Sequence, residues 1–123
     1  MSIQSFKDLD VWKMSMDLVD EIYKITEQLP RNEIFGLSSQ LQRASVSIPS
    51  NIAEGSKRSS RADFRYYCLM ALGSSAEVET QLIIVARRYS NIDVEYAMNL
   101  VVRVQKMLTS LGKSLKPTTV RQP

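Results

Sequence analysis

The chain has 123 residues with a net charge of +3, and 44% of them are hydrophobic and 24% charged, which is the ordinary balance of one globular domain. It has no histidine and a single cysteine, Cys68, so an internal disulfide, Ser-His-Asp or Cys-His catalysis and nearly all zinc sites are excluded. No signal peptide and no uncharged stretch long enough for a bilayer is visible, so we expect a cytoplasmic protein without a membrane segment.

The first predicted helix begins near Asp8 or Asp10 and ends before Pro30, which stops it. Acidic residues in its first turn suit the helix dipole. Its apolar residues are three or four positions apart, which predicts one buried stripe. These residues are Leu9, Trp12, Met16, Val19, Ile22, Ile25 and Leu29.

The second predicted helix covers residues 32–54, with Asn32 as N-cap and Gly55 as C-cap. Pro49 in its interior lacks an amide donor and pushes against the carbonyl of Ser45, which predicts a kinked helix. The hydroxyls expected to help satisfy the freed carbonyl belong to Ser45, Ser47 or Ser50. The alternative is two short helices that are broken at Pro49. The apolar face of this segment comprises Ile34, Leu37, Leu41, Ala44, Ile48 and Ile52.

The third predicted helix covers residues 61–89, after a loop in which Ser59 or Ser60 can act as its cap. A heptad of core positions is formed by Cys68, Ala71, Ser75, Val78, Leu82, Val85 and Tyr89. A second stripe beside it comprises Leu69, Leu72, Ala76, Ile83 and Ala86. Two stripes predict that this helix contacts neighbours on two sides, and Gly73 between them suggests close packing.

The fourth predicted helix covers residues 94–115, after a turn and cap at Asn91 and Asp93. Its core positions are Val94, Ala97, Val101, Val104, Leu108, Leu111 and Leu115. Pro117 ends it, and residues 117–123 are expected to form a disordered tail. Residues 1–116 are therefore predicted to be an all-α domain, an up-down antiparallel four-helix bundle.

Charge is unevenly distributed along the chain. Residues 1–30 carry a net charge of −3, whereas residues 31–65 and 66–123 each carry +3. Such a field can attract a polyanion or a complementary subunit.

The clearest basic cluster predicts a nucleic-acid-binding site around the loop before the third helix. Its cations are Lys57, Arg58, Arg61 and Arg65, and Phe64, Tyr66 and Tyr67 are interleaved with them. Cations can contact phosphates, and an aromatic ring can stack on a base. The alternative is a solvated loop whose aromatic rings turn inward. A second basic set is either a solvated surface or one face of an oligomer: Arg87, Arg88, Arg103 and Lys106.

Two carboxylates in the third helix, Glu77 and Glu79, are two residues apart, so they cannot share one acid-base site within the chain. Ion pairs with Arg43, or with Arg87 or Arg88 of a neighbouring copy, are expected instead. Because the chain lacks histidine, a carboxylate-bridged metal bundle is excluded, and neither a metal nor another cofactor is expected.

Four segments together resemble one known family. The most specific comprises Ser47, Ile48, Pro49, Ser50, Asn51, Ile52, Ala53, Glu54 and Gly55, followed by Arg58 and Ser60. The others are residues 9–12 (LDVW), 41–44 (LQRA) and 73–80 (GSSAEVET). In these segments, and over residues 6–115 as a whole, the chain resembles the intervening-sequence proteins, bacterial proteins first noticed as reading frames inside insertions in large-subunit ribosomal RNA genes.

The resemblance implies an up-down four-helix bundle that assembles into a ring-like homopentamer, with no established catalytic activity. The family is also similar in architecture to accessory proteins of diversity-generating retroelements, which work with a reverse transcriptase and nucleic acid. Within the motif, Asn51, Glu54, Arg58 and Ser60 are either a functional loop that contacts RNA or a partner, or a lock that holds the helix end.

These observations predict a non-enzymatic, homo-oligomeric bundle that presents basic surfaces to RNA or to a protein that handles nucleic acid. The alternative is a protein–protein adaptor or assembly module without a nucleic-acid role. No small-molecule substrate is expected.

Overall fold

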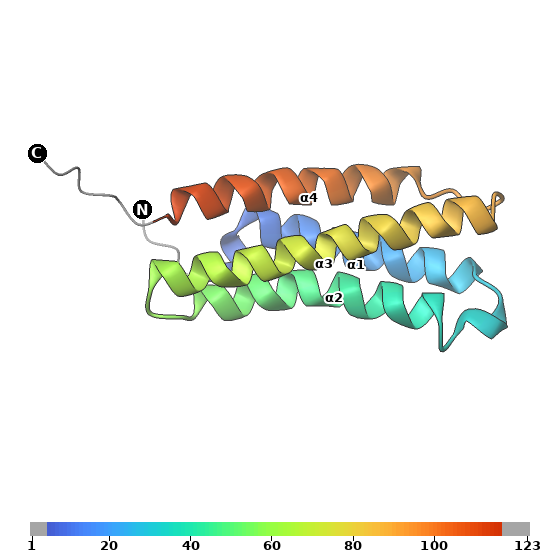
Figure 1. Ribbon diagram of the computed structural model, residues 1–123, viewed down its shortest axis with the longest axis horizontal. Coiled ribbons are helices and arrows are strands. Elements are labelled where there is room, and N and C mark those ends of the chain that lie inside the picture. The colour runs from blue at the N-terminus through green and yellow to red at the C-terminus, as the bar shows by residue number, and fades with distance from the viewer. Residues whose placement is uncertain (1–4, 117–123) are drawn as a thin grey trace, which may run out of the picture.

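The structure, a computed structural model, describes residues 5–116 and consists there of helices without strands. The long helices are α1 (Asp10–Gln28), α2 (Leu37–Ser56), α3 (Arg61–Arg88) and α4 (Glu95–Ser114), and the short 3₁₀ helices are η1 (Phe6–Asp8) and η2 (Arg31–Glu33). Consecutive helices run in opposite directions and pack against each other, and α1 packs against α4 (Figure 1). The prediction of an all-α four-helix bundle is therefore confirmed, whereas the predicted tail at 117–123 lies outside the described residues.

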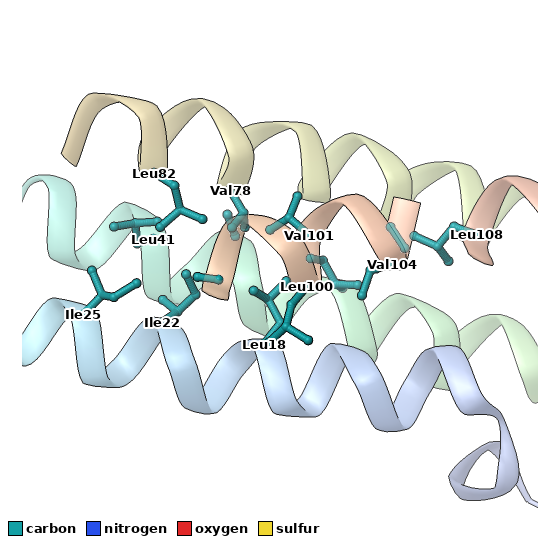
Figure 2. Packing of buried hydrophobic residues seen from close by; sticks show 14 of the residues in the cluster. Leu18, Ile22, Ile25, Leu41, Val78, Leu82, Leu100, Val101, Val104 and Leu108 are labelled. Carbon is teal, nitrogen blue, oxygen red and sulfur yellow. The ribbon is translucent and has the colours of Figure 1, made fainter. Parts of the chain in front are cut away.

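The core runs along the whole bundle axis and draws on all four helices (Figure 2). Leu18, Ile22, Leu41, Leu82 and Val101 are among the side chains that are almost wholly buried there. The predicted heptads of α3 and α4 supply most of the buried residues on their side of the core, as the 3.5-residue spacing requires.

The predicted core stripe of α1 is wrong in its first half. Val11, Ser15 and Leu18 are buried, whereas Met16 is 38% exposed and Trp12 is half-buried. Both sets have helical spacing, so the spacing alone could not decide between them. Ser15 fits the core because its hydroxyl donates a 2.8 Å hydrogen bond to the carbonyl of Trp12.

The start of α2 also differs from the prediction. Asn32 lies inside η2, and α2 begins at Leu37 with Gly36 at its N-cap. The carboxylate of Glu33 accepts a hydrogen bond from the amide of Leu37 at 3.3 Å, which satisfies one free donor of the first turn. A side chain inside the preceding 3₁₀ turn therefore takes the role that we assigned to Asn32.

Pro49 lies within one continuous helix, so the alternative of two short helices is wrong. The predicted kink stays a prediction. The serine hydroxyls form other bonds than expected: Ser45 donates to the carbonyl of Gln42 at 3.0 Å, and the Ser47 and Ser74 hydroxyls lie 2.9 Å apart. No described residue's hydroxyl donates to the freed carbonyl of Ser45.

Gly55 is not a C-cap, because α2 continues to Ser56 and no described glycine has a positive φ. A Cβ atom at Gly55 would lie 2.7 Å from Cβ of Tyr67 and 2.9 Å from Cδ1 of Phe64. The glycine therefore allows the end of α2 to approach the beginning of α3.

The second stripe predicted for α3 is mostly exposed: Leu69, Ala76, Ile83 and Ala86 lie outward, whereas Leu72 is half-buried against the core. Tyr66, Leu69, Met70, Ile83 and Ile84 are each at least 40% exposed. By length and composition alone α3 could cross a membrane, yet 44% of the stretch that meets this criterion is buried in the bundle. A Cβ at Gly73 would meet nothing within 4 Å, so the packing reason expected for this glycine is not found within one copy.

Candidate nucleic-acid interface

The up-down topology collects basic side chains from several helices at one end of the bundle. The end of α2, the start of α3 and the end of α4 meet there (Figure 1). We call this surface the basic end, and it comprises Lys7, Lys57, Arg58, Arg61, Arg65, Lys113 and Lys116. Four acidic residues lie among these seven cations: Asp8, Asp10, Glu54 and Asp63. Every cation of the basic end except Arg65 is exposed.

Arg58 is held in a defined position at the centre of the α2–α3 connection. Its Nη2 donates hydrogen bonds to Oε2 of Glu54 at 2.8 Å and to the hydroxyl of Tyr67 at 2.6 Å. The guanidinium also lies 5.0 Å from the centre of the Tyr67 ring. The hydrogen bond to Glu54 is the main reason that the pKa of Arg58 is raised. One of the four predicted cations is therefore already paired, although its side chain remains open to solvent.

Arg61 links the basic loop to α4, because its Nη2 donates a hydrogen bond to the backbone carbonyl of Ser114. That carbonyl lies in the last turn of α4, where free acceptors favour a cation. Lys57 reaches toward η1 instead, with Nζ 6.0 Å from the centre of the Phe6 ring. The Arg61 contact places the start of α3 beside the end of α4, which has Lys113 in its last turn and Lys116 just beyond it.

Arg65 is half-buried, and its buried Nε has no hydrogen-bond partner among the described residues. Two of the neighbouring aromatic side chains, Phe64 and Tyr67, are also half-buried and pack at the α2–α3 contact. Tyr66 is 57% exposed and is the ring of this group that is open for stacking. The predicted stacking surface for a base therefore fits Tyr66, whereas the alternative of aromatic rings that turn inward fits Phe64 and Tyr67.

The remaining motif residues have structural partners. The Nδ2 of Asn51 donates to the carbonyl of Ser47 at 2.8 Å and to its hydroxyl at 2.9 Å. Ser60 accepts a 3.0 Å bond from the amide of Asp63, which confirms it as the cap of α3. Together with the ion pair between Glu54 and Arg58, these bonds fit the interpretation that the motif holds the end of α2 in place.

The ion pairs expected between Arg43 and the carboxylates of α3 are not formed within the described residues. Glu79 instead accepts a 2.9 Å hydrogen bond from Nε2 of Gln105 on α4. The second basic set is divided between two places: Arg87 and Arg88 end α3, whereas Arg103 and Lys106 are exposed in the middle of α4. Residues 5–116 contain no group of three or more acidic or thiol side chains that could hold a metal.

Cys68 is not a reactive thiol in this arrangement. It is 1% exposed, and burial raises its pKa to about 11. A nucleophilic cysteine needs the opposite, a lowered pKa and access to solvent.

Three members of the basic end were not predicted from the sequence, namely Lys7, Lys113 and Lys116. The signal that could have identified them was the predicted topology, because an up-down bundle places the ends of its second and fourth helices at the same end.

Comparison with known proteins agrees with this architecture. The family model described as 23S rRNA-intervening sequence protein matches residues 7–110. A crystal structure of a protein of unknown function, from the S23 ribosomal protein family of Bacteroides thetaiotaomicron VPI-5482, is similar at 29% sequence identity with a TM-score of 0.75. The match covers 84% of this chain and 95% of that one. No curated protein gives a significant match.

Proposed function

The chain belongs to the family of 23S rRNA-intervening sequence proteins, and from that premise we propose that it is a non-enzymatic, homo-oligomeric bundle that binds RNA through its basic end. The observation that carries the proposal is the contact of Arg61 with the end of α4, which brings it together with Lys113 and Lys116 from the far end of the chain. Cations that are gathered on one surface contact phosphates independently of base sequence.

The geometry of the basic end supports a site for RNA rather than for a small anion. Its exposed cations are spread over the ends of three helices and are not gathered into a closed pocket. An extended polyanion can contact several such cations at once, and the exposed ring of Tyr66 offers a stacking surface beside them.

Self-assembly is the second part of the proposal. The outward stripe of α3 comprises Tyr66, Leu69, Met70, Gly73, Ala76, Ile83 and Ile84, all of which are exposed. An apolar face of this length on a small protein is typical of a protein–protein contact. We propose a homopentamer, in which the basic end would occur five times and weak phosphate contacts would add up through avidity.

The same stripe favours the alternative function, an adaptor that binds other proteins. A partner that covers α3 through apolar contacts would be largely insensitive to salt, whereas binding to phosphates weakens steeply as the salt concentration rises. Salt dependence therefore separates the two functions.

The proposal is tested by fluorescence-anisotropy titration of the protein with a labelled structured RNA at two salt concentrations. A variant with Lys57, Arg58, Arg61 and Arg65 changed to glutamate should lose binding while its mass in solution stays the same. The control variant carries Arg87→Glu and Arg88→Glu, which change charge at the opposite end of the bundle. If the wild type does not bind at low salt, or if both variants bind equally, the proposal is wrong.

A further inference from the structure

A polar groove between α2 and α3 lies outside the basic end. It has a volume of about 470 Å³, within the range of about 300–1,000 Å³ that is usual for ligand sites. Three of the four segments that carry the family resemblance meet in it, because residues 41–44, Ser47 and residues 73–80 all contribute to its lining. The lining residues used below are Phe35, Arg43, Ser47, Ser74, Glu77 and Gln81.

The charged and amide groups of the groove are not engaged by the protein. Arg43 and Glu77 carry opposite charges, yet no ion pair or side-chain hydrogen bond joins either of them to a described residue. Gln81 is only 8% exposed, and its Oε1 has no hydrogen-bond partner within residues 5–116. Because that oxygen is buried, Arg43 and Glu77, which are both exposed, are the groups that a ligand in the groove can reach.

Phe35 forms one rim of the groove and is 98% exposed, the most exposed large apolar side chain in the described chain. It lies between η2 and α2, where no neighbouring element packs on its ring. A flat aromatic ligand in the groove could stack on this ring, as unpaired bases stack on exposed aromatic side chains.

The occupant must therefore have a flat face, adjacent donors for the two oxygens of the Glu77 carboxylate, and an acceptor for Arg43. Guanine fits these demands best, since its N1–H and 2-amino groups are adjacent donors and its O6 and N7 are acceptors that arginine binds. Adenine and cytosine each offer only an amino group as donor, and uracil offers a single N–H. We infer that the groove binds an unpaired guanine base.

An unpaired guanine that belongs to an RNA agrees with the proposed binding of RNA at the basic end, and in this respect the inference rests on the proposed function. Glu77 is 16 residues beyond Arg61 on the same helix, so at about 1.5 Å per residue the two sites are about 24 Å apart. One single-stranded segment of a few nucleotides can contact both. A free guanine nucleotide is the other source with the same chemistry.

The test uses labelled eight-nucleotide RNAs that differ only at one position in a uridine background, which is guanosine, inosine or adenosine. Inosine lacks the 2-amino group, so the wild-type protein should bind that RNA about tenfold more weakly than the guanosine RNA. Glu77→Gln should reduce this difference to less than about twofold, and Glu79→Gln, at a carboxylate that is already bonded to Gln105, should leave it unchanged. Phe35→Ala should weaken binding of all three RNAs.

The outcomes distinguish this inference from the proposed function. If the wild type binds all three RNAs equally and in a salt-dependent way, RNA binding stands and the guanine site is wrong. If none of the three RNAs binds, GMP alone is titrated into the protein and its binding is measured by calorimetry. Binding of GMP that depends on Glu77 supports the groove with a free nucleotide as ligand, whereas absence of GMP binding overturns the inference and leaves the proposed function to the titration with structured RNA.

Discussion

The hydroxyl of Tyr89, at the C-terminal end of α3, donates a 2.6 Å hydrogen bond to Oε2 of Glu33 in η2. The other carboxylate oxygen of Glu33 accepts from the amide of Leu37. The carboxylate of Glu33, the last residue of η2, therefore bonds to both the start of α2 and the end of α3. These two bonds fix the connection between α1 and α2.

This contact makes stability depend on pH in the acid range. The bond from Tyr89 is the main cause that lowers the pKa of Glu33 below its ordinary value of 4.5. A lowered carboxyl pKa stabilises the fold above pH 4.5, and this contribution is lost as the pH falls through the lower folded value. Tyr89→Phe should therefore be less stable than the wild type at pH 7, with a difference that shrinks toward pH 3. Urea unfolding at several pH values measures it, with Tyr96→Phe as an exposed control; a difference that is independent of pH would contradict the assignment.

Gly55 and Gly73 should respond in opposite ways to substitution by alanine. At Gly55 the new methyl group would overlap Tyr67 and Phe64, so we expect a loss of about 1–3 kcal/mol in the free energy of unfolding. At Gly73 there is open space in a helix interior, so alanine should increase that free energy by up to about 1 kcal/mol. Urea unfolding of both variants measures the effects, and a neutral Gly55→Ala would show that the α2–α3 contact is looser than described.

The thiol of Cys68 should be unreactive in the native protein. It is buried, and its pKa is raised to about 11, so the thiol stays protonated at pH 8 and inaccessible to reagents. Titration with a chromogenic disulfide should give no rapid reaction until urea unfolds the chain. Stoichiometric labelling without denaturant would mean that the α3 core opens readily.

The outward stripe of α3 should control assembly. Light scattering with size-exclusion chromatography should give the mass of a pentamer for the wild type and that of a monomer for a variant with Leu69→Glu and Ile83→Glu. Both side chains are more than 40% exposed, so the helical content of this variant should be unchanged. Val102→Glu, at an exposed position of α4, is the control. A monomeric wild type at micromolar concentration would show that the stripe has another role.

Residue spacing predicted the four helices and most of the buried positions of α3 and α4 correctly, because long repeats of apolar residues leave few alternatives. It failed where two local patterns compete. In α1 both Val11 and Trp12 belong to stripes with helical spacing, and only packing against α2 and α4 selects Val11.

The candidate site was less predictable than the fold, since its contacts join residues far apart in the sequence. Arg61 and Ser114 are 53 positions apart, and Gly55 contacts the beginning of the following helix rather than ending its own. Local sequence preferences describe a residue among its chain neighbours, so they assigned Gly55 to a cap and left Lys113 and Lys116 out of the site.

The position of the basic end has a consequence for the shape of any ring. Copies related by rotation about one axis all point the same way along it. If the bundles stand along that axis, every basic end would lie on one side of the ring, and the η2 ends with Phe35 would lie on the other. Such a ring would be a disc with two unlike sides, and an RNA bound through the basic ends would lie on one of them, opposite the side that carries Phe35, Arg87 and Arg88.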